Sequence, residues 1–104
     1  MREPQKSGVF PDDTNDLLQA MQPLKNLRLR GLMTMPPYGH EAEMSRPWFQ
    51  ALKKISVKLA DKNFFYDNKA IELSMGMSGD FKVAIEEGAT LVRVGTAIFG
   101  ERSL

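Results

Sequence analysis

Helical and strand signals alternate along the chain, and this alternation limits the folds that its 104 residues can adopt. The helical pattern covers residues 14–22, 45–59 and 79–87, and the strand pattern covers residues 27–35, 71–74 and 90–94. Helices and strands that alternate in this order are typical of a parallel sheet with crossover helices. Three strands cannot close a barrel, and a sheet covered on one face leaves its other apolar face in water. The sequence therefore predicts an α/β fold that forms part of a larger structure.

The apolar spacing predicts which side of the two shorter helices is buried. The residues expected to face inward are Leu17, Leu18 and Met21 in the first helix and Phe81, Ala84 and Ile85 in the last. Asp12 and Asp13 are able to cap the start of the first helix, and Pro23 stops it. Gly88 is expected to end the last helix as its C-terminal cap.

The long middle helix is predicted from apolar residues that recur at steps of three and four. Its expected inward residues are Met44, Trp48, Phe49, Leu52, Ile55 and Leu59. Lys53, Lys54 and Lys58 fall on the other side, which we expect to face water. Pro47 indicates that the regular part begins near Ser45, because proline is tolerated in the first turn of a helix.

The second and third strand segments both run into small, hydrogen-bonding residues. The second continues as LSMGMSGD over residues 73–80, and the third as VRVGTAIFG over residues 92–100. Backbone N–H groups at such strand-to-helix turns bind phosphate, with about 0.3–1 kcal/mol from the helix dipole. We expect the two strand ends to meet, so that their main-chain donors hold one dianion. The same spacing also fits a plain N-cap at Ser78 and a strand-ending turn at Gly95.

Composition excludes several other classes of site. The formal net charge is +1 and the lysines are scattered, so neither nucleic acid nor an anionic membrane is an expected partner. The chain has no cysteine, which excludes disulfides and thiolate chemistry. His40 is the single histidine, and it supports neither a metal site nor a Ser-His-Asp arrangement. The chain shows no membrane span and no signal-peptide pattern, so we expect a cytoplasmic protein.

Several segments of the chain resemble one known family. They are LSMGMSGD at 73–80, AI at 84–85, GAT at 88–90, VRVGTAIFG at 92–100, LRGLMTMP at 29–36 and KSGV at 6–9. These segments are similar to the C-terminal signature and the middle segments of the pyridoxal phosphate homeostasis proteins, the YggS or PROSC family. The resemblance spans nearly the whole chain.

The resemblance implies a fold and a cofactor. The family's fold is a (β/α)8 TIM barrel like the N-terminal domain of alanine racemase. Its cofactor is pyridoxal 5′-phosphate (PLP), which is held as a Schiff base to a lysine near the end of an early strand. No segment here matches that lysine. The resemblance therefore implies that residues 1–104 are a single unit, the C-terminal half of a PLP-binding barrel, and we expect the chain to be a truncated form.

The resemblance also gives roles to individual positions. The implied cofactor-binding residues are Ser74, Met77, Ser78, Gly79, Arg93, Gly95 and Thr96. Ser78 and the amides around Gly79, Gly95 and Thr96 are implied to face the cofactor phosphate. Arg93 is implied to approach the pyridine nitrogen, where an arginine that keeps its proton leaves that nitrogen unprotonated and the ring a weaker electron sink. Alternation along the strand also predicts that Arg93 points opposite to Val92 and Val94. A surface arginine on an edge strand is the other interpretation of Arg93.

Three functions are compatible with these features. The first is a non-catalytic carrier that binds PLP inside cells and supports its supply to PLP-dependent enzymes. The second is a PLP-dependent amino-acid racemase, which needs an acid or base such as tyrosine, but Tyr38 and Tyr66 lie in loops without a supporting motif. The third is a fragment without catalytic activity that self-associates, because a half-barrel exposes strand edges and apolar surface.

Overall fold

The computed structural model describes residues 8–36, 41–95 and 98. Its elements are, in chain order, η1 (Pro11–Asp13), α1 (Thr14–Met21), β1 (Gly31–Met33), α2 (Ala42–Asp61), β2 (Glu72–Met77), α3 (Phe81–Glu86) and β3 (Leu91–Arg93). The three strands form one sheet in the order β1-β2-β3, and both pairs are parallel. The predicted alternation of helices with parallel strands is therefore confirmed.

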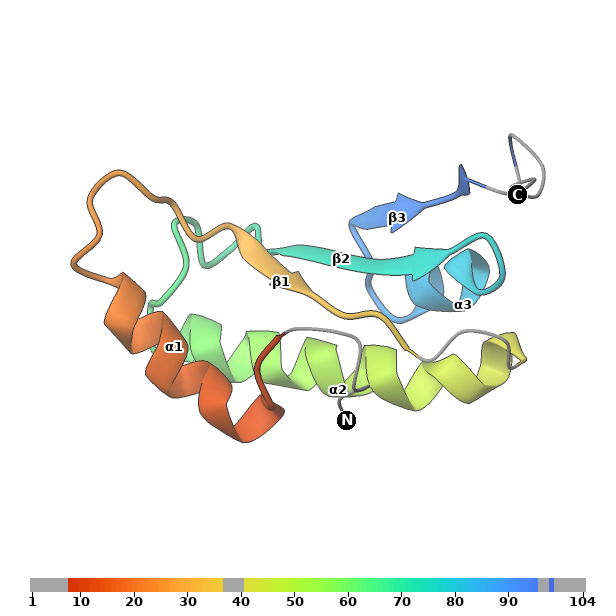
Figure 1. Cartoon of the computed structure of the whole chain (residues 1–104), viewed down its shortest axis with the longest axis horizontal. Helices are drawn as coiled ribbons and strands as arrows, with labels where there is room; N and C mark the ends of the chain where they lie inside the picture. The colour runs from red at the N-terminus through yellow and green to blue at the C-terminus, as the bar shows by residue number, and fades with distance from the viewer. Residues whose placement is uncertain (1–7, 37–40, 96–97, 99–104) are drawn as a thin grey trace.

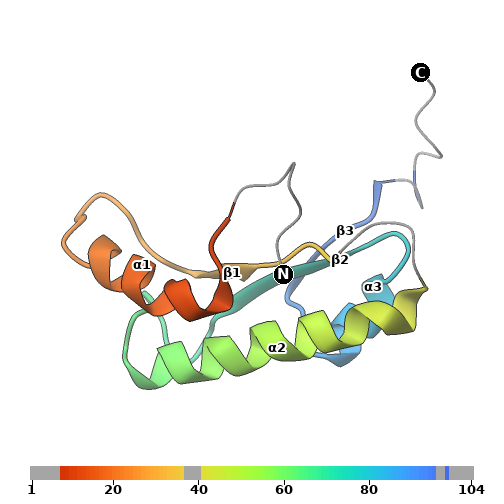
Figure 2. The ribbon, with the colours of Figure 1, turned by 60° about the horizontal axis from the view of Figure 1, so that its bottom comes forward.

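The helices lie on one face of the sheet (Figures 1 and 2). Leu73 and Met75 of β2 point into this helical layer and pack against Phe49 of α2 and against Val83 and Ala84 of α3. In the part of the chain that the structure describes, no helix covers the opposite face, which we call the bare face. Alternation along β2 thus sends its large apolar side chains to one side of the sheet.

A second buried cluster lies at the other end of the helical layer. Leu18 of α1 packs against Leu59 of α2 and against Phe65, which lies between α2 and β2. Each of the three side chains is at most 4% exposed. The segment before β2 is therefore held by apolar burial as well as by its hydrogen bonds.

The strands differ in length from those expected. β1 covers Gly31–Met33 and not 27–35, because it is an edge strand and Leu27 before it is 57% exposed. A Cβ at Gly31 would overlap the carbonyl oxygen of Glu72, so β1 approaches β2 closely there. β2 extends past residue 74 to Met77, and β3 covers Leu91–Arg93 and not 90–94.

Glycine makes the extension of β2 possible. Gly76 has a φ of +104°, a backbone conformation that side chains disfavour, and the register with β3 shifts between Ser74 and Met77. A Cβ at Gly76 would lie 2.6 Å from the Cβ of Ala84, so α3 packs directly on the strand at this point. The sequence pattern treated these small residues as a loop, whereas they form the irregular end of a strand.

Three residues expected to face inward are exposed instead. Leu17 is 41% exposed, Met44 57% and Ile85 54%. In α2 the covered stripe includes two serines, and its members are Ala42, Ser45, Phe49, Leu52, Ser56 and Leu59. The Ser56 hydroxyl donates to the Lys53 carbonyl at 2.7 Å, so a polar group is buried without losing its hydrogen bond. In α3 the buried side chains are Val83 and the expected Ala84, and not Ile85.

The helix ends agree with the expectations only in part. α2 begins at Ala42, before the expected start near Ser45, and accommodates Pro47 in its interior. Asp13 is the N-cap of α1 but makes no side-chain cap bond, and the Thr14 hydroxyl bonds to the Phe10 carbonyl instead. Gly88 ends α3 as expected, with a φ of +103°. The bonds from Gly88 N to Ile85 O and from Ala89 N to Ala84 O complete a Schellman cap.

Candidate cofactor site

The carboxyl ends of β2 and β3 lie side by side at one edge of the sheet (Figure 1). Met77 pairs with Arg93 in the parallel register, so the loop after β2 and the residues after β3 leave from the same edge. Ligands of open parallel sheets bind beyond the carboxyl ends of the strands. The expectation that these two strand ends meet is therefore confirmed.

The loop between β2 and α3 is a closed turn. The Asp80 carboxylate accepts the Met77 N–H at 2.8 Å, and the Asp80 N–H donates to the Met77 carbonyl at 3.1 Å. These two bonds enclose Ser78, which is half-buried, and Gly79, which is exposed. The Met77 N–H is therefore already bonded within the turn. Met77 contributes to the site by its position at the end of β2, and its N–H is not a donor for a ligand.

Asp80 has a structural role that the sequence pattern did not assign. We expected it at or near the start of the last helix, where it is the N-cap by position but makes no side-chain bond to the helix. Its carboxylate reaches back along the chain instead. The sequence did contain a signal for this role, because aspartate commonly bonds to nearby backbone N–H groups in turns.

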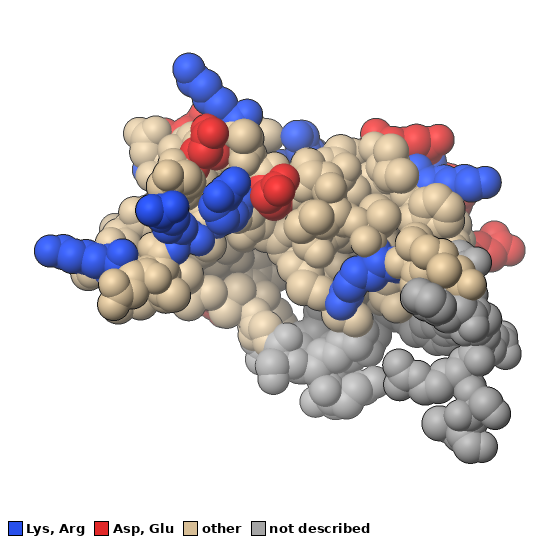
Figure 3. All heavy atoms as spheres, turned by 90° about the horizontal axis from the view of Figure 1, so that it is seen from above, with Lys and Arg blue, Asp and Glu red and all other residues tan. Residues whose placement is uncertain are grey.

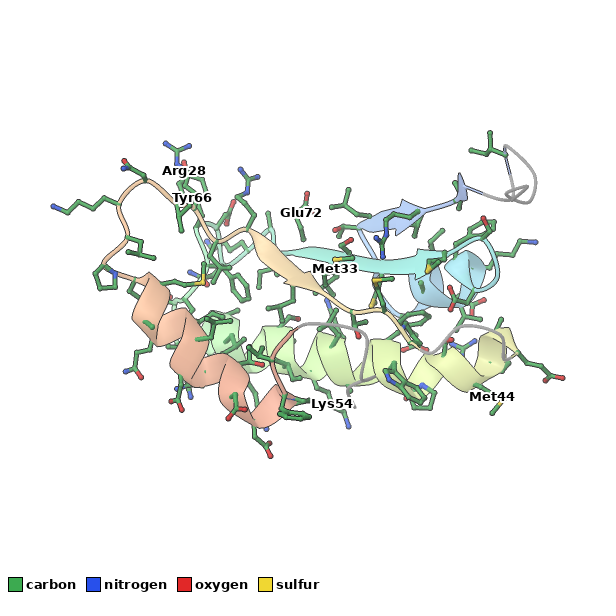
Figure 4. The ribbon with its side chains drawn as sticks, viewed as in Figure 1. Arg28, Met33, Met44, Lys54, Tyr66 and Glu72 are labelled. Carbon is green, nitrogen blue, oxygen red and sulfur yellow. The ribbon has the colours of Figure 1, made fainter. Side chains whose placement is uncertain are left out.

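Ser74 and Arg93 belong to the bare face of the sheet. Leu73 and Met75 point into the helical layer, so alternation sends Ser74 to the opposite side. Ser74 is paired with Met33 of β1 and with Leu91 of β3, both of which are 51% exposed. Arg93 is two residues beyond Leu91 and is also exposed. Figure 4 shows Glu72 on the side of the sheet away from α2, and the parallel register places Met33 on the same face.

Arg93 carries a charge that other described residues do not neutralise. Val92 is half-buried and lies near Gly76 on the α3 side, so the expected opposition between Val92 and Arg93 is confirmed. Within residues 8–36 and 41–95, no carboxylate lies within ion-pair distance of the Arg93 guanidinium. Its positive charge is therefore open to an anion or another polar group at the bare face.

Glycine at two of the expected site positions is not required by packing. A Cβ at Gly79 or at Gly95 would meet no atom within 4 Å. Both residues are exposed, and neither has a positive φ. Their lack of a side chain leaves open space at the carboxyl edge of the sheet. Thr96 lies outside the described residues, as do His40 and Tyr38.

An ion-pair cluster on the outer side of the helices holds α3 against α2. The Arg46 guanidinium contacts Glu87 at 2.5 Å, Glu86 at 2.7 Å and Glu43 at 2.9 Å. The hydrogen bond from Arg46 lowers the pKa of the Glu43 carboxyl, and the bonds to Glu43, Glu86 and Glu87 raise the pKa of Arg46. The cluster thus fixes the C-terminal end of the short helix that follows the turn.

Two other kinds of feature are absent from the described residues. They contain no group of three or more His, Cys, Asp or Glu residues that is able to hold a metal ion. No helix among them has the length and hydropathy needed to cross a membrane.

Comparison with known proteins places the chain in a family. The family model described as alanine racemase, N-terminal domain, matches residues 1–103, and the chain belongs to that family. Within it, the chain is similar to curated pyridoxal phosphate homeostasis proteins. It is 46% identical to those of Aquifex aeolicus and Pseudomonas aeruginosa and 41% identical to the human protein, in each case over 96% of this chain. The family resemblance expected from the motifs is therefore confirmed.

Solved structures agree with this assignment. PipY of Synechococcus elongatus without PLP matches 96% of this chain with a TM-score of 0.80 and 34% identity. The same protein with PLP bound matches 95% with a TM-score of 0.76 and 32% identity. The chain spans 42%, 40% and 37% of the Aquifex, Pseudomonas and human proteins and 46% of each PipY chain.

Proposed function

We propose that this chain provides the phosphate- and pyridine-contacting part of a PLP site in a non-catalytic protein of intracellular PLP homeostasis. The observation that carries the proposal is the parallel pairing of Met77 with Arg93, which brings the Ser78–Gly79 turn and the end of β3 to one edge. The names of the curated relatives and the PLP bound to PipY support this choice of ligand.

The residues at this edge fit a phosphorylated pyridine. Ser78 carries a hydroxyl, and the turn that Asp80 closes holds this residue beside Gly79, where no side chain blocks an approaching phosphate. Gly95 offers a second unobstructed backbone position after β3. Arg93, on the bare face with Ser74, is suited to contact the ring and to favour its unprotonated nitrogen. Bound PLP supplies an aldehyde and an electron-withdrawing ring, and these residues position both.

We further propose that the chain corresponds to the C-terminal half of a (β/α)8 barrel. Helices on one face and a bare opposite face match the outer ring and the interior of such a barrel, and barrel sites lie at the carboxyl ends of the strands. The share of the relatives that the chain spans, 37–42%, supports a half-barrel. In that arrangement the lysine that forms the Schiff base belongs to the other half. The complete protein then supplies PLP to PLP-dependent enzymes in the cytoplasm.

A racemase-like enzyme is the less favoured function. Racemisation needs an acid or base beside the cofactor, and Tyr66 lies before β2, at the amino ends of the strands. The proposed site lies at their carboxyl ends. The curated relatives cited above are named as homeostasis proteins and not as enzymes.

Titration with pyridoxine 5′-phosphate tests the site directly. This probe keeps the ring and the phosphate but has no aldehyde that reacts with surface lysines, and binding is followed by amide NMR shifts. Loss of one hydrogen bond to a charged phosphate should weaken binding by roughly tenfold in Ser78→Ala. Arg93→Gln should weaken binding as well, whereas Lys54→Gln, on the outer side of α2 (Figure 4), should leave it unchanged. Equal binding of pyridoxine without a phosphate would contradict the proposal.

Self-association is a separate part of the proposal. β1 and β3 each have one side without a strand neighbour in the described sheet, and Met33 and Leu91 are exposed on its bare face. We expect the chain to form dimers or larger species. Sedimentation velocity over a range of concentrations measures this, and a single monomeric species throughout would contradict it.

A further inference from the structure

Two arginines converge on one exposed aromatic ring at the amino ends of the strands. The Arg28 guanidinium carbon lies 4.8 Å from the centre of the Tyr66 ring, and that of Arg30 lies 5.4 Å from it. Tyr66 is 57% exposed. Figure 4 shows Arg28 and Tyr66 next to each other, beyond the start of β1. Both contacts are within the range of cation–π attraction.

The backbone beneath this ring is fixed. The Tyr66 N–H donates to the Leu29 carbonyl at 2.7 Å. Because Leu29 lies between Arg28 and Arg30, this bond holds both arginines next to the segment before β2. Phe65 and Asn68 exchange two hydrogen bonds, at 3.0 and 3.2 Å, and Phe65 is buried. A surface that is ordered before a partner arrives loses less conformational entropy on binding.

A small, open hollow adjoins the arginines. It has a volume of about 130 Å³, and Arg28 and Tyr66 themselves line it. Its apolar lining includes Met21, Leu24, Leu27 and Phe64. Leu24 is 50% exposed and Leu27 57%. The Gln22 side chain donates to the carbonyls of Leu18 and Phe64, which holds the end of α1 to the wall of the hollow.

The two arginines form no ion pair with a described carboxylate. In the described part of the chain, neither Arg28 nor Arg30 makes an ion pair, in contrast to Arg46 with its three glutamates. Figure 3 shows that basic side chains outnumber the acidic ones among them at the end of the molecule where the loop between α1 and β1 lies. Two guanidinium groups near one ring repel each other, and a carboxylate between them relieves that repulsion.

We propose that this surface, defined by Arg28, Arg30, Tyr66, Leu24 and Leu27, binds an acidic segment of a partner protein. One apolar side chain of the segment enters the hollow, and carboxylates next to it contact the two arginines. A protein segment fits better than a nucleic acid because most residues that line the hollow are aliphatic or aromatic and the net charge of the chain is only +1. The surface lies at the strand ends opposite to the proposed PLP site, so this inference does not depend on that site.

Peptide titrations test the proposal with the 104-residue chain. The probe is the blocked peptide Glu-Glu-Leu-Glu-Glu, with Glu-Glu-Ala-Glu-Glu, Lys-Lys-Leu-Lys-Lys and a ten-nucleotide oligothymidylate as comparisons. Amide NMR shifts locate the binding site and give each Kd. We expect shifts at residues 22–30 and 64–68 with the first peptide, and weaker binding of the alanine and lysine peptides.

Two variants separate charge from the apolar anchor. Removal of both charges in Arg28→Gln with Arg30→Gln should weaken binding by roughly fivefold, as expected for two exposed ion pairs. The matched control, Lys54→Gln with Lys58→Gln, removes two exposed charges from α2 and should not change the Kd. Leu27→Ala should weaken the binding of the leucine peptide more than the binding of the alanine peptide.

Three results would overturn the proposal. One is an equal loss of binding in the arginine and lysine double variants. Another is equal affinity for the leucine, alanine and lysine peptides. The third is oligothymidylate that binds at the same residues more tightly than the acidic peptide, which would assign the surface to nucleic acid.

Discussion

The two faces of the sheet share one backbone but differ in what their side chains do. On the helical face, Leu73 and Met75 are each 2% exposed and are packed by both α2 and α3. On the bare face, Met33 and Leu91 are each 51% exposed, and Ser74 and Arg93 lie among them. The comparison indicates that the helical face carries the stability of the chain, and that the bare face is available for a ligand or for other strands.

Truncation of Phe49 should give the largest effect. Its side chain is fully buried at the centre of the helical face, so Phe49→Ala should lower the free energy of unfolding by about 3–5 kcal/mol. Met33→Ala, on the bare face, should lower it by less than about 1 kcal/mol. Urea denaturation monitored by circular dichroism measures both, and similar losses in the two variants would remove the distinction between the faces.

Gly76 tests how tightly α3 is packed on β2. Gly76→Ala adds a methyl group at a positive φ and 2.6 Å from the Ala84 Cβ, so it should cost about 1–3 kcal/mol of unfolding free energy. Gly79→Ala makes the same chemical change where the new methyl meets nothing within 4 Å. Thermal denaturation of the pair should show a lower Tm for Gly76→Ala only. A Tm unchanged in both would show that the helical face tolerates the added volume.

Asp80 connects the helical face to the proposed site. Asp80→Ala removes the acceptor of the Met77 N–H and should destabilise the chain by about 1 kcal/mol. Because the turn loses its closing bond, affinity for pyridoxine 5′-phosphate should fall as well. Asp80→Asn keeps an acceptor oxygen and should recover most of both losses. Failure of the asparagine variant to do so would mean that the negative charge matters and the hydrogen bond does not.

The ion-pair cluster predicts a smaller, pH-dependent effect. Arg46 lowers the pKa of Glu43 from its ordinary value of 4.5, so the native state favours the charged carboxylate. The corresponding stabilisation is complete above that ordinary value and is lost as the pH falls through the lowered one. Stability should therefore fall as the pH drops below the ordinary value of 4.5, and this fall should be smaller in Arg46→Gln. Chemical denaturation at several pH values measures the unfolding free energy of the unchanged chain and of Arg46→Gln. The same dependence on pH in both proteins would contradict the prediction.

Arg93 should give the smallest effect on stability. Arg93→Gln changes an exposed side chain that makes no ion pair with another described residue, so the unfolding free energy should change by less than about 0.5 kcal/mol. The same variant is expected to lose affinity for pyridoxine 5′-phosphate. A large destabilisation would show that the bare face also contributes to folding, and the comparison would then fail.

Much of the fold and the meeting of the β2 and β3 ends followed from the sequence. The alternation of helical and strand patterns predicted the parallel sheet, because crossover connections leave few topologies to choose from. The opposition of Val92 and Arg93 and the left-handed cap at Gly88 were also predicted, since both depend on local geometry. The roles of individual residues toward the cofactor depended on family resemblance and remain predictions.

The errors arose where tertiary packing overrides a local pattern. Ser45 and Ser56 occupy the covered stripe of α2 because small side chains allow close approach, whereas Met44 is left outside. The strand was expected to end at Ser74, but β2 continues to Met77, and Gly76 within it lets α3 lie directly on the strand. The Asp80 turn was missed because an aspartate before a helix is ordinarily interpreted as a forward cap.

The close approach of β1 to β2 at Gly31 has a consequence for how this sequence varies. No side chain fits beside the Glu72 carbonyl, and the neighbouring strand cannot retreat without breaking the register on both sides. If all twenty amino acids were tested at position 31 and folded variants were selected, we therefore expect only glycine to be recovered. Met33, two residues along the same strand, should accept a wide range of replacements.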